Sequence, residues 1–429
     1  MISFIGANRE QVTFMPHDLN SWLPEDHLAR FVVDIVDRMD LCHVYSGYSG
    51  TGSVPYDPKL LLSLLFYGYS TGVFSSRKIE KATYDSVAFR FIAGNHHPDH
   101  DTISSFRKKH LEKLKNWFKE ILLIGNELGL IKLGNIFIDG TKVQANASKH
   151  KAMSYKRMKQ LEEKLACEID ELMSLAQKQD ENDDASTVDV PDEIKRRKER
   201  LTKIGEAKKV IESRRKEAYD QEKADFDKKQ VAREKKEKET GKKTKGKKPK
   251  EPSPEPRDKE QYNFTDPESR IMKTNKGFDQ CYNAQIATNE EMLIVGCYAN
   301  AHHNDKQEFL PTIASVPDEL KPQITSAVAD TGYYSQHNIE NCPEGINPII
   351  AKSKEKHNSY IEELLHPKDD KEKEIYRKRK YTVEPVFGII KEVLGFRRFS
   401  FRGEENIDNE WGLVCLAYNL KRMFNLKIA

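Results

Sequence analysis

The chain has 429 residues, more than one hydrophobic core normally organises, so we expect two or more structural units. Its composition is polar, with 37% hydrophobic and 32% charged residues, which predicts a large segment outside any core, and its formal net charge of +3 excludes no class of partner. No stretch approaches roughly twenty apolar residues and no secretory apolar core opens the sequence, so we expect a cytoplasmic protein with no membrane partner.

Residues 1–128 have the pattern of a compact all-α domain. Apolar residues at helical spacing predict a helix around Leu28–Ile35, and Asp57-Pro58 is typical of a helix start before the apolar run 60–66. A third helix is expected from Ser75. One long helix is expected from about Asp101, with a single apolar stripe made of Ile103, Phe106, His110, Leu114, Trp117 and Ile121.

Basic residues on the last two of these helices are candidates for contact with DNA phosphates. They are Arg77, Lys78, Arg107 and Lys108. A helix with a basic face can lie on a DNA backbone or in a groove, but a solvated helix face has the same appearance.

The loop Asn95–Asp101 is rich in histidine and aspartate, which is typical of a metal site. Asp101 as the cap of the next helix and Pro98 as a turn former explain the same residues without a metal. Because no cysteine lies nearby, we favour the turn over a zinc site.

The pattern changes to α/β at residues 129–149. A buried strand through Ile136–Ile138 is expected to end at Asp139, and a further strand-like stretch covers Val143–Ala147. A residue at a strand end can direct its side chain out of the sheet while its backbone stays anchored. Asp139 is therefore the first candidate ligand.

Residues 150–261 are almost wholly charged. Met158, Leu161, Leu165, Leu172 and Leu175 fall on a and d positions of a heptad, and a weaker seam follows at Ile194, Leu201, Ile204 and Ile211. A polar break between Asp180 and Pro191 predicts an antiparallel coiled-coil hairpin. The segment Gly241–Lys250 then has the composition of a flexible basic linker, which could attract DNA or simply be solvated.

The α/β pattern resumes at residues 262–429. A strand hairpin is expected over 282–288 and 292–299, a helix over 305–315, and a strand over 324–329 that ends at Asp330. A strand over 346–351 and a helix from Thr382 follow. On that helix Glu384 and Lys391 are seven residues apart and can face one substrate, since seven residues return to within about 20° of the same direction.

Two strand-end aspartates and a helix-borne glutamate predict a magnesium site. Carboxylate oxygens are the ligands Mg²⁺ prefers, and the ion keeps waters and substrate phosphate oxygens in its shell. Each residue alone has a structural explanation, because Asp139 and Asp330 precede glycines and can form turns, and Glu384 can pair with a helix dipole. Their joint order favours phosphodiester chemistry.

The element order, strand with Asp, hairpin strands, helix, strand with Asp, helix, strand, helix with Glu, resembles that of DDE-class transposases of bacterial insertion sequences. The residues that carry the resemblance are 136–141, Asp266–Arg270, Gly277-Phe278, Tyr282–Gln285, Ala329–Tyr334, Val383–Gly388 and Trp411–Leu420. It implies a ribonuclease-H-like catalytic domain at 129–149 and 262–429. That domain is interrupted by the charged hairpin at 150–261 and preceded by the helical domain at 1–128.

The resemblance also implies the site. Asp139, Asp330 and Glu384 would hold two Mg²⁺ or Mn²⁺ ions, with Lys391 beside them. A related group carries a Tyr, Arg, Glu, Lys signature; Lys391 fits its spacing, but Tyr376 and Arg379 are one residue too far upstream and Lys380 takes the arginine place. The residues expected to bind DNA are Arg77, Lys78, Arg107, Lys108, Lys142, Arg379, Lys380, Arg397, Arg398 and Arg402.

The expected activity is that of a DNA transposase in the bacterial cytoplasm, associated with the nucleoid. It would bind the terminal repeats, act as a metal-dependent endonuclease and join 3′-hydroxyl ends to target DNA, as a homodimer in the synaptic complex. Three alternatives remain open: a nuclease without strand transfer, a catalytically silent DNA-binding regulator derived from a transposase, and a coiled-coil interaction protein whose charged hairpin is the functional part.

Overall fold

The computed structural model describes residues 18–48, 54–182, 190–240, 250–275, 277–351 and 369–428. The chain forms two compact units, one made of residues 1–144 and 282–429 and the other of residues 145–281. The second unit contains the predicted charged hairpin. None of the helices in the described ranges is long and apolar enough to cross a membrane.

The first unit begins with a helical N-terminal region. Its α-helices are α1 (Leu28–Arg38), α2 (Cys42–Tyr45), α3 (Pro58–Ser70), α4 (Ser76–Asp85), α5 (Val87–Ile92), α6 (His100–Lys109) and α7 (Leu114–Glu127). The expected helices around Leu28, after Asp57 and from Ser75 are confirmed as α1, α3 and α4. Asp57 caps α3, since its side chain accepts a hydrogen bond from the Lys59 amide at 2.8 Å.

The single long helix expected from Asp101 is wrong. Helix α6 ends at Lys109, a 3₁₀ turn covers Leu111–Lys113, and α7 begins at Leu114. The break lets Leu111 be buried together with the predicted stripe, which is also buried throughout. The N-terminal cap of α6 also differs from expectation. The side chain of Asp99, not that of Asp101, accepts a hydrogen bond from the Thr102 amide.

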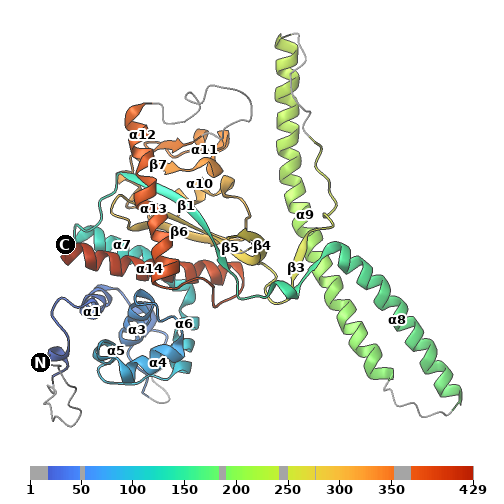
Figure 1. Cartoon of the computed structure of the whole chain (residues 1–429), viewed down its shortest axis with the longest axis horizontal. Helices are drawn as coiled ribbons and strands as arrows, with labels where there is room; N and C mark the ends of the chain where they lie inside the picture. Colours follow the sequence, from blue (N-terminus) through green and yellow to red (C-terminus); the bar gives the residue numbers. More distant parts are fainter. Residues whose placement is uncertain are drawn as a thin grey trace, which may run out of the picture. The chain divides into compact units, whose positions relative to one another are not determined.

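A mixed α/β domain follows, built on one twisted sheet (Figure 1). The strands that belong to the first unit are β1 (Asn135–Gln144), the second half of β5 (Gly277–Thr288), β6 (Ile294–Asn300), β7 (Ser326–Ala329) and β8 (Asn347–Ile350). Their order is β6-β5-β1-β7-β8. The central strands β1, β7 and β8 are parallel, and β5 and β6 form the predicted antiparallel hairpin.

Strand β1 differs from the prediction in one respect that matters for the site. It does not end at Asp139 but continues through Gly140 to Gln144. The neighbouring strand β7 is shorter and ends at Ala329. Asp139 therefore lies within β1, at the level where β7 has just ended.

The helices of this domain pack on the sheet and on each other. They are α10 (Phe309–Ala314), α11 (Gln336–Glu340), α12 (Asp370–Arg377), α13 (Arg379–Gly388) and α14 (Glu404–Ile428), with a π-helix at Ile389–Val393 and short 3₁₀ turns at Asp305–Gln307, Lys321–Gln323 and Thr331–Tyr333. Helix α14 is the central one: it packs on β6, α3 and α7 (Figure 1). Its Trp411 donates a hydrogen bond to the Gln285 carbonyl at 3.0 Å.

Helix α13 begins earlier than expected, at Arg379 rather than Thr382. Val383, Phe387 and Ile390 follow helical spacing and are buried, so this face of the helix is directed to the interior. Pro385 is consequently inside the helix and not in its first turn. The carbonyl that loses its amide partner is that of Tyr381, a residue 74% exposed, so water can take the partner's place.

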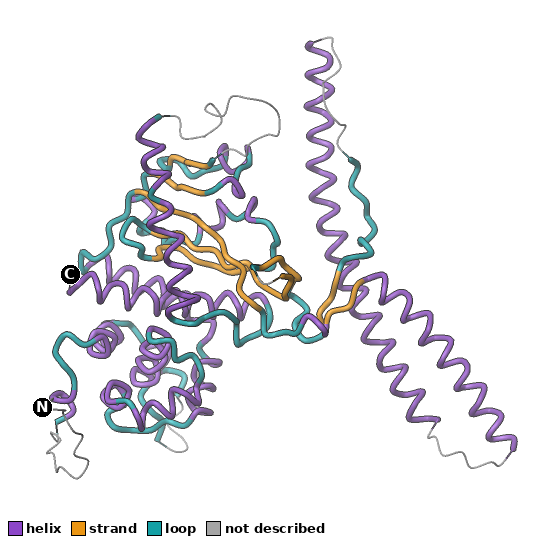
Figure 2. The backbone as a smooth tube through the Cα atoms, in the orientation of Figure 1, coloured by secondary structure: helices purple, strands orange, loops and turns teal. Residues whose placement is uncertain are grey.

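The second unit is dominated by the helical hairpin of α8 (Tyr155–Asn182) and α9 (Val190–Thr240), seen as two long purple helices in Figure 2. Its short strands are β2 (Ala152–Ser154), β3 (Gln261–Asn263) and β4 (Arg270–Thr274), and β4 pairs with the first half of β5. Contacts of Arg197 with Glu168 and of Lys208 with Glu162 show that the helices are antiparallel.

The predicted seam of the hairpin is confirmed in part. Met158, Leu165, Ile204 and Ile211 are buried in one apolar cluster, with Leu161 and Leu201 packed against it, whereas Leu172 and Ile194 are half-buried and outside the cluster. The Leu175 side chain, the turn residues 183–189 and the basic segment 241–249 lie outside the described residues.

Candidate active site

The two aspartates predicted as ligands lie within β1 and directly after β7, its parallel neighbour. Asn135 is paired with Ser326 and Phe137 with Val328, the last pair of this ladder, so Asp139 and Asp330 each lie two residues beyond it. Asp330 directly follows β7, where its side chain accepts the Gly332 amide at 2.8 Å.

The electrostatic environment of Asp139 agrees with this pairing. Burial raises the pKa of the Asp139 carboxyl to about 6, and the negative charges of Asp330 and Asp305 act in the same direction, while Arg379 and the Gly140 amide oppose the rise. An aspartate with a pKa this high is one that a positive charge would stabilise.

Arg379 provides part of that compensation from α13. Its guanidinium lies 3.6 Å from Asp139 Oδ2, and its side chain is only 9% exposed. The same guanidinium stacks on the Tyr376 ring at 5.8 Å. Arg379 was expected to bind DNA, whereas the structure places it in the interior beside a predicted metal ligand.

Glu384 is not gathered with the two aspartates. It is exposed, on the flank of α13, because the helix turns Val383 and Phe387 toward the interior. Among the residues that the structure describes, no group of three His, Cys, Asp or Glu side chains could hold a metal ion. Glu384 belongs to α13, a helix that packs on β1.

Lys391 lies close to the strand that carries Asp139. Its Nζ donates hydrogen bonds to Thr141 Oγ1 at 2.5 Å and to the Lys142 carbonyl at 2.9 Å. The residue belongs to the π-helix Ile389–Val393 that follows α13. Such single π turns are frequently found at functional sites.

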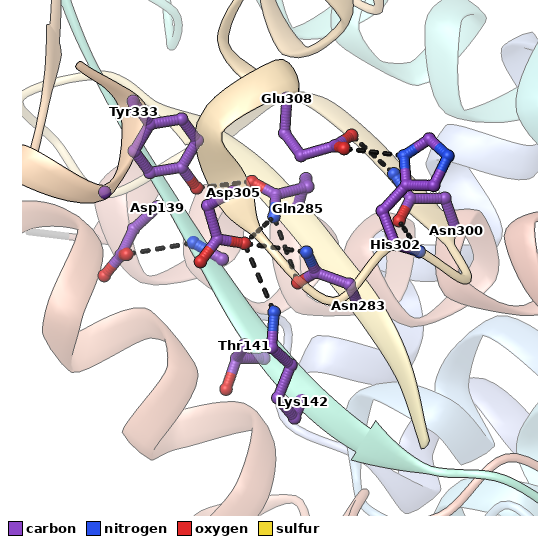
Figure 3. A network of polar contacts seen from close by, with 12 residues as sticks. Asp139, Thr141, Lys142, Asn283, Gln285, Asn300, His302, Asp305, Glu308 and Tyr333 are labelled. Carbon is purple, nitrogen blue, oxygen red and sulfur yellow. Dashed lines mark hydrogen bonds and ion pairs between the residues drawn. The ribbon is translucent and has the colours of Figure 1, made fainter. Parts of the chain in front are cut away.

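A polar network beside the aspartates was not found by sequence reasoning (Figure 3). Asp305 Oδ1 accepts hydrogen bonds from Asn283 Nδ2 at 2.7 Å and Gln285 Nε2 at 2.9 Å, and it pairs with Lys142 Nζ at 3.3 Å. The Tyr333 hydroxyl donates to Gln285 Oε1 at 2.5 Å. The available signal was the two polar residues Asn283 and Gln285 among the apolar residues of 281–287, and the structure shows both fully buried.

Gly140 is required by this network. A Cβ atom at this position would lie 2.2 Å from Gln285 Nε2 and 3.0 Å from Asp305 Oδ1. Only a residue without a side chain lets the amide of Gln285 approach β1 so closely. The Asp-Gly pair at 139–140 is therefore explained by packing and not by a turn, since β1 continues through it.

Two protein-family models match the sequence. The model described as Transposase domain (DUF772) matches residues 17–109, and the one described as Transposase DDE domain matches residues 243–420. Together they span more than half of the chain, and the second includes Asp330 and Glu384. The chain belongs to the DDE transposases. Comparisons with curated proteins and with solved structures gave no match.

The basic residues assigned to DNA in this transposase lie in different environments. Arg77, Lys78, Lys108, Lys380, Arg398 and Arg402 are exposed. Arg397 is half-exposed and pairs with Glu392. Lys142 is engaged by Asp305.

Arg107 differs most from its predicted role. It donates to the Tyr69 hydroxyl at 2.8 Å and to the Phe74 carbonyl at 3.1 Å, and its guanidinium stacks on the Phe401 ring. These contacts connect the helical region to the segment before α14. Arg107 therefore has a structural role in the transposase.

The histidine side chains of the loop 95–101 contact residues of α4. His100 Nδ1 contacts Glu80 Oε2 at 2.8 Å, and His97 Nδ1 contacts Thr83 Oγ1 at 3.1 Å. The His97 ring also stacks on Tyr84. These side chains join the loop to α4.

Proposed function

We propose that the protein is an insertion-sequence transposase that binds the ends of its element, cleaves phosphodiester bonds with divalent metal ions and transfers the 3′-hydroxyl ends to target DNA. The observation that supports the proposal is that Asp139, within β1, and Asp330, directly after the parallel strand β7, lie two residues beyond the same strand pair. The family to which the chain belongs supports the DNA substrate.

The strand order supports a ribonuclease-H-like catalytic domain. In chain order the strands of the first unit are β1, β5, β6, β7 and β8, and in space they are arranged as β6-β5-β1-β7-β8, that is third, second, first, fourth and fifth. The hairpin unit enters this fold between its first and second strands. We therefore assign residues 129–149 and 262–429 to the catalytic domain and 150–261 to an insertion.

The donor set at the site suits Mg²⁺ or Mn²⁺. Asp139 and Asp330 provide carboxylate oxygens from adjacent strands, and a bound cation would offset the unfavourable charge that raises the pKa of Asp139. When bound, two ions would supply activation of the attacking water or hydroxyl and stabilisation of the leaving oxygen. Asp139 and Asp330 would hold them, and Arg379 would keep Asp139 oriented between catalytic cycles.

Glu384 is proposed as the third acidic ligand. It is solvent-exposed and belongs to a helix that packs on β1, so α13 can deliver it to DNA bound over the two aspartates. Completion of the site only when DNA is present would restrain a cutting enzyme from indiscriminate cleavage. Lys391, held against Thr141 and Lys142, would contact the phosphate beside the cut.

Both ends of an element must be processed together, so we propose a homodimer in the synaptic complex. The hairpin of α8 and α9 is a candidate arm for the second protomer or for DNA. The exposed basic residues on α4 and α6, Arg77, Lys78 and Lys108, are candidates for contact with the terminal repeats.

A cleavage and joining assay distinguishes this proposal from its alternatives. Short duplexes with the ends of the element are incubated with the protein and Mg²⁺ or Mn²⁺. Joined products support the transposase, cleaved products alone indicate a nuclease without strand transfer, and a shifted band without cleavage indicates a silent DNA-binding regulator.

The matched variants Asp139→Asn, Asp330→Asn and Glu384→Gln test the site residues. Each is expected to abolish cleavage while DNA binding persists, because each removes one carboxylate and little volume. Unchanged cleavage by one variant would remove that residue from the site, which is the sharpest test for Glu384. Deletion of residues 150–260 tests the interaction-protein alternative, which predicts lost partner binding with retained metal binding.

A further inference from the structure

The backbone ladder between β1 and β7 does not reach the two candidate ligands. The last paired residues are Phe137 and Val328, so Asp139 and Asp330 lie two residues beyond the ladder. Strand β1 continues, but Asp330 enters the short turn Thr331–Tyr333. Side-chain contacts between the two segments can therefore contribute to the separation of the two carboxylates.

Asp305 lies at the node that connects these two segments. On one side it pairs with Lys142 Nζ, three residues after Asp139. On the other side it accepts from Gln285 Nε2, and Gln285 Oε1 in turn accepts from the hydroxyl of Tyr333, three residues after Asp330. The chain of contacts Lys142, Asp305, Gln285, Tyr333 thus joins the strand of one ligand to the turn of the other (Figure 3).

The loop that carries Asp305 is itself anchored. Glu308 is buried, and its carboxylate accepts hydrogen bonds from Asn300 Nδ2 and from the Tyr298 hydroxyl and contacts His302 Nδ1 at 2.7 Å (Figure 3). Asn338 Nδ2 donates to the Lys306 carbonyl at 2.8 Å. Both ends of the loop are held, so Asp305 has a defined position at the edge of the site.

The hydrogen-bond donors around Asp305 favour a negatively charged side chain at this position. Three donors converge on Asp305 Oδ1, namely Asn283 Nδ2, Gln285 Nε2 and the Lys142 ammonium. A carboxylate accepts several donors and forms charge-assisted bonds with an ammonium, which are about twice as strong as neutral ones. An asparagine would keep an acceptor but lose the charge that holds Lys142.

We propose that Asp305 is a positioning residue that fixes the separation of Asp139 and Asp330 by joining β1 to the turn after β7. This inference deepens the proposed function, because the separation of the two carboxylates sets how well they hold a divalent ion. Groups that orient metal ligands typically change metal affinity by about 10–100-fold when they are replaced.

The test uses the full chain and three variants. Asp305→Asn removes the charge at the node, and Tyr333→Phe breaks the far end of the network without changing charge or ring size. Asp318→Asn is the matched control, because Asp318 is also an aspartate of the first unit but its side chain is 87% exposed. Hydrogen exchange of the metal-free proteins and Mn²⁺ affinity by electron paramagnetic resonance are measured for all four.

Peptides containing Gly140 and Gly332 report on the two carboxylates, since these amides donate to Asp139 Oδ1 and Asp330 Oδ1. We expect several-fold faster exchange in both peptides for Asp305→Asn and Tyr333→Phe, and wild-type exchange for Asp318→Asn. We also expect Mn²⁺ affinity to fall by about 10–100-fold in the first two variants. Because Tyr333→Phe removes no charge, its loss of affinity cannot be the loss of a negative group.

Unchanged exchange in both network variants would overturn the inference, even if the wild type cleaves DNA. Faster exchange with unchanged Mn²⁺ affinity would overturn it as well, because the network would then be merely structural. Faster exchange in a protein whose wild type binds no Mn²⁺ and cleaves no DNA would support the connection between the two segments and overturn the proposed function instead.

Discussion

Replacement of Asp139 by asparagine is expected to stabilise the metal-free transposase at neutral pH. The Asp139 carboxyl has its pKa raised from 3.8 to about 6, first by burial and then by Asp330 and Asp305, with Arg379 only partly offsetting these effects. Asparagine has nearly the same shape and carries no charge. The variant therefore removes an electrostatic cost that the wild type bears when the carboxylate is ionised.

The sign and the size of this effect follow from proton linkage. Between its ordinary pKa and about 6, the folded chain keeps a proton on Asp139 that the unfolded chain has released, so the free energy of unfolding falls as the pH rises through this window. A rise of roughly two pKa units corresponds to about 3 kcal/mol, at about 1.36 kcal/mol per unit. Because the Asp139 side chain is 20% exposed to water, this value is an upper bound.

The assay is thermal unfolding in a chelating buffer from about pH 4.5 to about pH 8, the range that spans the shifted titration. The melting temperature of Asp139→Asn should exceed that of the wild type by a few degrees above the shifted pKa, and the difference should shrink toward acidic pH. Added Mg²⁺ should raise the melting temperature of the wild type and not that of the variant. Asp34→Asn, a change of the same kind at an exposed position on α1, is the control.

Equal melting temperatures of Asp139→Asn and the wild type over the whole range would refute the reasoning. So would a variant that is less stable at neutral pH, because asparagine would then be losing a favourable interaction of the carboxylate. In either case the raised pKa could not be used as support for a cation at this position.

Three further changes test other parts of the structure. Arg379→Gln should lower the free energy of unfolding by about 1–3 kcal/mol at neutral pH, since it leaves the Asp139 carboxylate without its cation. Urea titrations measure this loss of stability. The loss should be largely relieved in the double variant that also carries Asp139→Asn. Gly140→Ala should lower the free energy of unfolding by about 1–3 kcal/mol and suppress cleavage, because the new Cβ atom would meet Gln285. Gly205→Ala in α9, where no atom lies within 4 Å of the new Cβ, should be neutral or stabilising when both variants are compared by thermal unfolding. Met158→Ala should destabilise the hairpin unit by about 2–5 kcal/mol and make it sensitive to limited proteolysis, and unchanged digestion would show that the α8–α9 seam contributes little.

The main helices and strands could be predicted from the sequence because their signals are local. The apolar stripe of α1, the Asp57-Pro58 start of α3 and the apolar run before Asp330 each depend on a few neighbouring residues. The break at His110 was not predicted, because it depends on the burial of Leu111 against distant elements. The spacing of apolar residues along the chain does not reveal such a tertiary contact.

The candidate site likewise has a part that could be predicted from the sequence and a part that could not. Asp139 and Asp330 come directly after short apolar runs, so their position on the sheet could be inferred from the order along the chain, although β1 continues past Asp139. The roles of Arg379, Asp305 and Gln285 could not be inferred, because the atoms that they contact are separated from them by long stretches of sequence. A surface role for Arg379 was the reasonable expectation for an arginine in a charged helix.

The points at which the chain leaves and re-enters the sheet are neighbours. The Ala145 amide donates to the Gln280 carbonyl at 2.8 Å, so the two crossings to the hairpin unit lie side by side. A segment whose ends are joined in this way can be lengthened, shortened or exchanged during evolution without altering the register of the strands around it. The length of the hairpin of α8 and α9 can therefore change independently of the sheet that carries Asp139.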